Sequence, residues 1–312
     1  MFLPPAGRAR RQGKVPVDPL TPLGTTWEDE RQTDGSRARV LALLLAGAEC
    51  PFSCVFCDLW RRTLDGSTPQ GAIPAQIDHA LTRSGPVPAG SSVKLYNASN
   101  FFDARAVPPE DDRAIARLVA PFARVIVESH PRLIGQRCLN FAARLNGTLE
   151  VAVGLETANP EVLARLDKGM TLEDFDRAAD RLSGAGVGLR VFLLLPPPFL
   201  AADDACNWIV RSVDYAVARG AAHVSLIPTR IDEPTPGAWS QDTVRPSLAF
   251  IENVVDRTVT TTGTVVTLDL WDIDHHVTCT ACRAARVARL HNINLTGRAV
   301  PRVACLLCTS SS

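Results

Sequence analysis

The chain has 312 residues, 46% of them hydrophobic and 21% charged, which is the composition of an ordinary globular protein long enough for one large barrel or two domains. Its formal net charge is zero, so no overall field draws it to nucleic acid or to an anionic membrane. We find no apolar signal region after Met1 and no run of 18 apolar residues, and therefore expect a cytoplasmic enzyme without a membrane span.

The predicted elements begin after an N-terminal segment without periodicity. Residues 1–37 are rich in Pro, Gly, Arg and Asp and predict a flexible extension, with a short helix near 26–32. From Arg39 onward, short β-branched or Leu-rich runs alternate with helical patterns. Seven runs predict strands, at 39–46, 93–96, 125–128, 149–153, 189–195, 224–227 and 265–270. Six segments predict helices, at 73–83, 109–122, 132–145, 172–183, 203–219 and 246–261.

This alternation predicts parallel βα units whose strands are buried on both faces. Six or seven units are too few for a closed eight-fold barrel. We therefore predict an α/β fold, a partial and open (β/α)6-type TIM barrel over 38–270, followed by a small Cys-rich metal-binding region at 271–312. The active residues of such a barrel lie at the carboxyl ends of its strands.

Three cysteines follow the first predicted strand of the barrel at the spacing C-x3-C-x2-C: Cys50, Cys54 and Cys57. Cysteine thiolates are the usual ligands of iron–sulfur clusters. A 4Fe–4S cube held by three cysteines keeps one iron open, and an open position is what separates a reactive metal site from a structural one. A zinc loop and three core cysteines without ligands are the alternatives.

This motif, with Phe56 directly before its third cysteine, resembles the signature of the radical S-adenosylmethionine (radical SAM) superfamily. The resemblance implies the same partial barrel, a 4Fe–4S cluster, and S-adenosylmethionine whose amino and carboxylate groups bind the open iron. It implies that Phe56 lies near the adenine. It also implies an external electron donor of the ferredoxin or flavodoxin type, and cleavage to a 5′-deoxyadenosyl radical that abstracts hydrogen from a substrate.

Polar residues follow the other predicted strands. After 93–96 come Asn97, Ser99 and Asn100, where the superfamily typically carries a Gly-Gly-Glu-like segment that contacts the methionine amino group. Glu128 and Glu156 follow the next two strands, and a buried carboxylate there needs a partner such as a ribose diol or an ammonium.

We predict Glu156 as the ribose contact, with Glu128 as a second cofactor contact or one half of an ion pair with Arg190. Arg190 itself is predicted either to meet a carboxylate of the cofactor or to balance Glu156. No residue is assigned to the chemistry on the substrate.

A longer pattern narrows the resemblance to the elongator-type branch of the superfamily. It consists of Gly154-Leu-Glu-Thr-Ala-Asn159, then Lys168-Gly169, and Leu193-Leu-Leu-Pro-Pro-Pro-Phe-Leu200. This branch includes a subunit that finishes a 7-deazaguanine modification of tRNA. The resemblance therefore implies a small-molecule or tRNA-linked substrate and a nucleoside modification of that kind.

A second cysteine group lies near the end of the chain, in two C-x2-C pairs: Cys279, Cys282, Cys305 and Cys308. Two such pairs offer four sulfurs to one metal centre, which is either zinc or an auxiliary 4Fe–4S cluster. The lack of a fifth cysteine and of a Cys-Pro signature favours zinc.

Two other functions compete with the radical enzyme. One is a non-enzymatic zinc-binding adaptor in which both cysteine groups are structural. The other is a TIM-like metal hydrolase using Glu156, His130 and His275, which needs a cluster of His and carboxylate ligands at strand ends.

Overall fold

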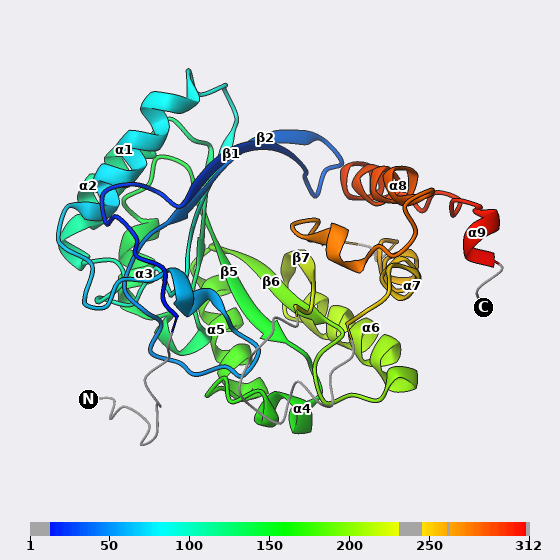
Figure 1. The fold of residues 1–312 in the computed structure, drawn as a ribbon. Helices are drawn as coiled ribbons and strands as arrows, with labels where there is room; N and C mark the ends of the chain where they lie inside the picture. The colour runs from blue at the N-terminus through cyan, green and yellow to red at the C-terminus, as the bar shows by residue number, and fades with distance from the viewer. Residues whose placement is uncertain (1–12, 231–244, 261–262, 310–312) are drawn as a thin grey trace. The chain divides into compact units, whose positions relative to one another are not determined.

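A computed structural model describes residues 13–230, 245–260 and 263–309 (Figure 1). Its strands form one sheet in the order β1 to β8, which is also their order along the chain. The strands are β1 Gly24–Arg31, β2 Arg37–Leu45, β3 Ser92–Asn97, β4 Arg124–Glu128, β5 Thr148–Glu156, β6 Gly188–Leu195, β7 Ala221–Pro228 and β8 Val265–Leu268. The predicted α/β class and the alternation of strands with helices are confirmed.

The helices follow the strands as the sequence pattern indicates. The α-helices are α1 Ala72–Ser84, α2 Asp112–Leu118, α3 Gln136–Ala142, α4 Pro160–Arg165, α5 Leu172–Gly184, α6 Ala202–Ala218, α7 Leu248–Thr258, α8 Arg283–Thr296 and α9 Leu306–Thr309. Short 3-10 helices are η1 Leu59–Arg62, η2 Pro109–Asp111, η3 Pro131–Leu133 and η5 Ile273–His276. Among these described helices, none has both the length and the hydropathy needed to cross a lipid bilayer.

The chain packs as two compact units that divide inside β5. The first holds the residues up to Glu28, Arg39–Ala152 and Gly184–Val187; the second holds Asp29–Ala38, Val153–Ser183 and the residues from Gly188 onward. The predicted limits at 37/38 and 270/271 stay a prediction.

In the first unit, strands β2, β3, β4 and the start of β5 are parallel, and Leu45 at the end of β2 is level with Asn97 at the end of β3. Helices α1, α2 and α3 lie along these strands (Figure 1). Leu41, Leu43 and Leu45 of β2 are all fully buried, because a parallel strand covered on both faces needs a continuous apolar run. The carboxyl ends of β2 and β3 therefore share one edge of the sheet.

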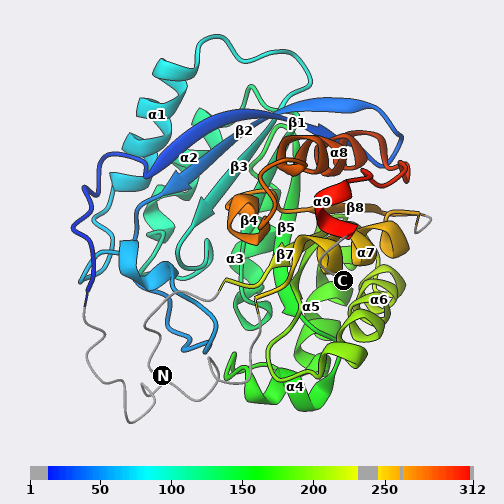
Figure 2. The same cartoon turned by 45° about the vertical axis from the view of Figure 1, so that its right-hand side comes forward.

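In the second unit, β6, β7 and β8 are parallel, with α6 packed on β6 and β7, and α7 and α8 on β8 (Figure 2). Helix α5 shows why these segments are helical. Its buried residues recur at helical spacing: Phe175, Ala178, Ala179 and Leu182. Thr171 and Asp174 cap its start by exchanging backbone and side-chain hydrogen bonds of 3.0 and 3.3 Å.

The segment predicted as an extension differs from its prediction. The short helix near 26–32 is wrong, because Gly24–Arg31 is strand β1, next to β2 in the sheet. Thr25, Thr26 and Trp27 favour a strand, and a turn closed by the Gln32 N–H to the Ser36 carbonyl, 2.8 Å, leads into β2. Residues 1–12 lie outside the described part.

Candidate functional site: two cysteine groups and the strand ends around them

The first cysteine group lies in a loop that leaves the carboxyl end of β2. A parallel bridge pairs Ala48 with Leu64, and the Leu64 N–H donates to the Gly47 carbonyl at 2.9 Å, so the base of the loop is closed. Inside it, the Cys57 N–H donates to the Cys54 carbonyl at 3.2 Å. Burial of the Cys57 thiol, and then the neighbouring charge of Cys54, raise its pKa to about 12. Cys50 and Cys54 both act electrostatically on Cys57, but among the described residues the three sulfurs do not form a group at the distance needed for a single metal ion.

Asn100 joins this loop to the ends of β3 and β4. Its Nδ2 donates to the Cys50 Sγ at 3.2 Å, and its Oδ1 accepts from the His130 backbone N–H at 2.7 Å. The His130 ring stacks on Phe52, inside the cysteine loop, with centroids 3.7 Å apart and planes 15° apart. Three predicted features of separate segments, the cysteines, Asn100 and His130, are thus in direct contact.

Beside Asn100, two buried polar atoms have no hydrogen-bond partner among the described residues. They are the Asn97 Nδ2 and the Ser99 Oγ. The other amide atom, Asn97 Oδ1, accepts from the Ser99 N–H at 3.0 Å. A buried donor without a partner costs about 1–3 kcal/mol. Such atoms at a sheet edge therefore mark the place where a polar ligand satisfies them.

Glu156 lies at the end of β5, in the second unit, with φ of +67°. It is buried, and its Oε1 forms an ion pair with the Lys168 Nζ at 2.5 Å. Gly154 makes room for this pair, since a Cβ there would lie 2.1 Å from the Glu156 Oε1 and 2.4 Å from the Lys168 Nζ. Lys168 stands in the motif quoted from the sequence, but its contact with Glu156 was not predicted.

Arg190 has a different partner from the ones predicted. Its two terminal nitrogens donate to both oxygens of Glu30, at 2.7 and 2.8 Å, and both side chains are buried. It stands near the start of β6 and faces His223 in register on β7, whereas cofactor contacts are expected at strand ends. The structure thus gives Arg190 a partner that was not predicted, and its role as a cofactor contact stays a prediction.

Glu128 ends β4 and is half-buried, and its backbone carbonyl accepts from the Phe101 N–H at 2.8 Å. Phe56 is half-buried. The roles of both toward a cofactor stay predictions.

The residues of the hydrolase hypothesis do not cluster: in the described ranges, the one group of His, Cys, Asp or Glu ligands at metal-binding distance consists of the C-terminal cysteines.

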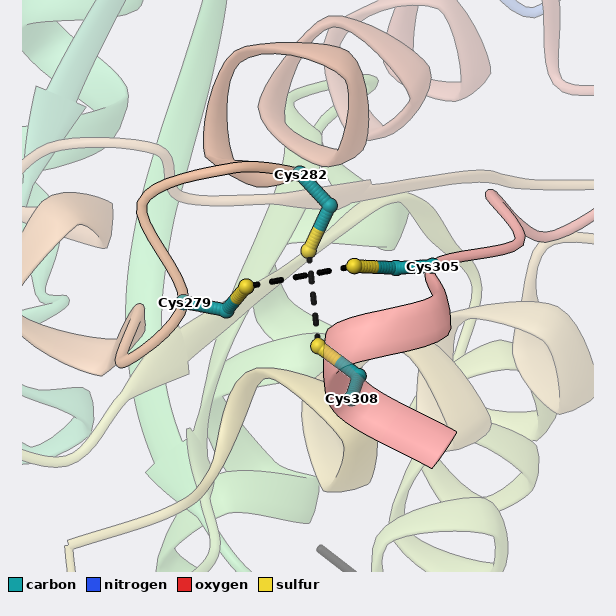
Figure 3. Close-up of side chains that lie close together, drawn as sticks. All are labelled: Cys279, Cys282, Cys305 and Cys308. Atoms are coloured by element: carbon teal, nitrogen blue, oxygen red, sulfur yellow. Dashed lines mark hydrogen bonds between the residues drawn. The ribbon is translucent and has the colours of Figure 1, made fainter. Parts of the chain in front are cut away.

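Those four cysteines converge in the second unit (Figure 3). The Sγ atoms all lie within 4.8 Å of one another, with 3.9 Å between Cys279 and Cys305 and 3.6 Å between Cys282 and Cys308. The Cys282 backbone N–H, then the Cys308 thiol, lower the pKa of Cys279 to about 6. Hydrogen bonds from Cys308 to the Cys282 and Cys279 sulfurs raise the pKa of Cys308 to about 12. The donor set suits a thiophilic metal.

Comparisons with known proteins agree with the cysteine motif. No protein-family model matches the chain. It is 27% identical to the archaeosine synthase subunit beta of Methanosarcina acetivorans over 251 residues, which cover 76% of this chain and 71% of that protein.

Two solved structures share the fold. Streptococcus suis SuiB, bound to S-adenosylmethionine, has a TM-score of 0.55 at 14% identity, covering 77% of this chain and 51% of SuiB. Methanocaldococcus infernus Elp3 has a TM-score of 0.52 at 14% identity, covering 73% of this chain and 56% of Elp3. The fold is thus the predicted partial barrel, shared with these two structures, and the sequence is similar to a subunit of archaeosine synthase, in agreement with the predicted resemblance to the elongator-type branch of the radical SAM superfamily.

Proposed function

We propose that this chain is a radical SAM enzyme in which Cys50, Cys54 and Cys57 hold a 4Fe–4S cluster and the end of β3 binds S-adenosylmethionine. The observation that carries this proposal is the Asn100 side chain. It donates to the Cys50 sulfur, and it closely follows Asn97 and Ser99, whose buried Nδ2 and Oγ atoms have no partner in the described chain. Three thiols after β2 and two unsatisfied polar atoms at the end of β3 suit a cluster with an open iron and a polar ligand that binds beside it.

When bound, the cluster would supply the electron that cleaves S-adenosylmethionine to methionine and a 5′-deoxyadenosyl radical, which takes hydrogen from the substrate. The protein's own part is to place and orient. Asn100 holds Cys50 at a fixed distance from β3, and a hydrogen bond to a cysteine sulfur also tunes the reduction potential of a cluster. The stack of Phe52 on His130 restrains the loop between Cys50 and Cys54.

Asn97 and Ser99 are assigned to the methionine end of the cofactor. The Asn97 Nδ2 suits a carboxylate, and the Ser99 hydroxyl suits a carboxylate or an ammonium, because a hydroxyl both donates and accepts. Phe56 is assigned to the adenine, and Glu128 to a further polar contact at the end of β4. Glu156 is assigned to the ribose, as the resemblance implies; a diol can donate to its carboxylate while Lys168 keeps the ion pair.

The substrate class is proposed from the relatives. The Methanosarcina acetivorans protein is named as a subunit of archaeosine synthase, which supports a nucleoside of the 7-deazaguanine type, tRNA-linked or free, and a partner subunit. An electron donor of the ferredoxin or flavodoxin type completes the proposal.

The test begins with anaerobic reconstitution with iron and sulfide, followed by measurement of 5′-deoxyadenosine from S-adenosylmethionine and a chemical reductant. The wild-type chain is expected to form it, and the Cys54→Ser variant is expected to fall to background. Cys206→Ser is the matched control, since Cys206 is a buried thiol of α6 that accepts from Arg257 at 2.9 Å. Zinc in the loop and no cleavage by the wild-type chain would instead support the adaptor.

A further inference from the structure

We propose that Cys279, Cys282, Cys305 and Cys308 bind one zinc ion, which fixes α9 to the beginning of α8 and takes no part in electron transfer. The proposal concerns the second unit alone and does not rest on the proposed function. It rests on sulfur geometry, on the charges around the sulfurs and on the way α9 is attached.

The sulfur distances match one tetrahedral ion. A zinc–sulfur bond of about 2.3 Å places the four sulfurs of a tetrahedron about 3.8 Å apart. The two contacts between the pairs, 3.9 Å for Cys279 with Cys305 and 3.6 Å for Cys282 with Cys308, lie on either side of this value. Each C-x2-C pair contributes one sulfur to each contact, so both pairs are needed to close the site (Figure 3).

The alternatives require other distances. A disulfide needs about 2.05 Å between sulfurs, whereas the Cys279–Cys305 and Cys282–Cys308 sulfurs are 3.9 and 3.6 Å apart. In a 4Fe–4S cube each cysteine binds a different iron, so the sulfurs are separated by the width of the cube in addition to their own bonds. Sulfurs that all lie within 4.8 Å of one another are too close for that arrangement. Zinc is preferred over a single ferrous ion because it binds such ligands more tightly.

The surroundings suit a centre of four thiolates around a divalent ion, which carries a charge of about −2. Cys282 is the N-cap of α8, where the helix dipole favours a negative sulfur. The Arg286 guanidinium donates to Glu252 and acts electrostatically on Cys282, so it places a positive charge beside this sulfur. Residues 275–312 contain no Asp or Glu, and their cationic side chains are Arg283, Arg286, Arg289, Arg298 and Arg302.

Helix α9 is short and exposed. It has four residues, and Leu306 and Leu307 are 90% and 64% exposed, so apolar burial contributes little to its attachment. The preceding link is held by Arg289, which donates to the carbonyls of Val300 and Pro301 at 2.6 to 3.0 Å, and by Arg302, which donates to Asp256 at 2.8 Å. Cys305 and Cys308 bring α9 to the beginning of α8, so an ion bound by all four sulfurs would join the two helices.

The experiment is a metal analysis that keeps the two cysteine groups apart. Zinc and iron per chain are measured after reconstitution in the wild type, in the Cys50→Ser/Cys54→Ser/Cys57→Ser triple variant and in Cys305→Ser/Cys308→Ser. We expect one zinc per chain in the wild type and in the triple variant, and none in the double variant. Cobalt substituted into the triple variant is expected to give the absorption of a tetrahedral tetrathiolate.

Limited trypsin digestion then measures the structural role. Chelated triple variant is expected to be cut at Arg298 or Arg302 at least tenfold faster than the zinc-loaded form, and added zinc should restore protection. Iron with sulfide or a single iron in the triple variant, a Cys279–Cys305 or Cys282–Cys308 disulfide, or cleavage that ignores zinc would each overturn the proposal. None of these outcomes depends on whether the wild type cleaves S-adenosylmethionine.

Discussion

The two cysteine groups differ in how completely their surroundings are satisfied. At the C-terminal group, four sulfurs lie within 4.8 Å of one another, and Arg286 acts electrostatically on the one at the start of α8. At the loop after β2 there are three sulfurs, and at the end of the neighbouring strand β3 the Asn97 Nδ2 and Ser99 Oγ have no partner among the described residues. A closed set of ligands maintains structure, whereas an open set with unsatisfied atoms beside it is ready for a ligand.

The largest expected difference between the groups is in thiol reactivity. In the metal-free chain, the pKa of Cys279 is lowered to about 6, so the fold favours its thiolate, and labelling by iodoacetamide should rise through pH 6 and level off above it. The pKa of Cys57 is raised to about 12, so the fold favours its neutral thiol and labelling should stay slow until strongly alkaline pH.

At pH 7 the thiolate fractions differ by about 10⁵, and the lower nucleophilicity of a low-pKa thiolate reduces the rate ratio to several hundredfold. The two pKa shifts make the free energy of unfolding depend on pH in opposite directions. The contribution of Cys279 is lost as pH falls toward 6, and that of Cys57 is lost as pH rises toward 12. Peptide mapping by mass spectrometry measures both rates; equal rates would remove the contrast.

The next largest effect concerns ligand loss at the closed group. Cys308→Ala removes one of four sulfurs, so zinc affinity should fall by more than the roughly 100-fold that loss of an outer contact such as Arg286 costs. Competition with a chromophoric chelator measures it. Arg286→Met, which keeps all four sulfurs, is the matched variant and should lose about 10-fold to 100-fold; an unchanged affinity in Cys308→Ala would contradict a four-sulfur site.

The third prediction concerns the buried ion pair of Glu156 with Lys168, whose charges are satisfied without a metal. Gly154→Ala places a methyl group where the ends of the Glu156 and Lys168 side chains lie, so the buried pair has to shift. The free energy of unfolding should fall by about 1–3 kcal/mol, as for other over-packed buried sites. Gly184→Ala is the control, since nothing lies within 4 Å of its added Cβ, and should stay within about 0.5 kcal/mol of wild type. Urea unfolding compares them.

The smallest expected effect concerns Ser99 and tests the proposed ligand site beside the cysteine loop after β2. Ser99→Ala removes a hydroxyl that has no partner in the described chain, so the free energy of unfolding should stay equal or rise by about 0.5 kcal/mol. Binding of S-adenosylmethionine by the cluster-loaded chain should weaken about tenfold, because one hydrogen bond is lost. Calorimetry measures both quantities. A stability loss without a change in affinity would make Ser99 an ordinary structural residue.

Sequence patterns predicted the parts of this fold whose causes are local. Strands β2 to β8 are apolar runs, and α5 repeats its buried residues at helical spacing, so both appear in short windows. Strand β1 was missed because Trp27-Glu-Asp-Glu30-Arg31 carries charge throughout and is only partly buried. The prediction that both cysteine groups bind metal rests on spacing alone, and in the described residues the four C-terminal sulfurs do lie at metal-binding distance.

Pairings across long sequence distances could not be predicted. Arg190 and Glu30 are 160 residues apart, and the interpretation of 1–37 as an extension removed Glu30 from the possible partners. The spacing of the C-terminal pairs predicted a metal site but not the distances between the sulfurs. Those distances depend on the path of the chain between the end of α8 and Cys305. Asn100 was predicted at the right strand end, but its contact with Cys50 arises only when β2 and β3 lie side by side.

The ion pair at the end of β5 has a consequence for selectivity. Because Lys168 already neutralises Glu156, the end of β5 carries no net charge before a ligand binds. A positively charged ligand would have to compete with the Lys168 ammonium for the Glu156 carboxylate. Uncharged hydroxyl groups can hydrogen-bond to the carboxylate without displacing the ammonium. In the proposed ribose site, the pair would therefore disfavour cations relative to uncharged hydroxyl groups, through a lysine twelve positions further along the same chain.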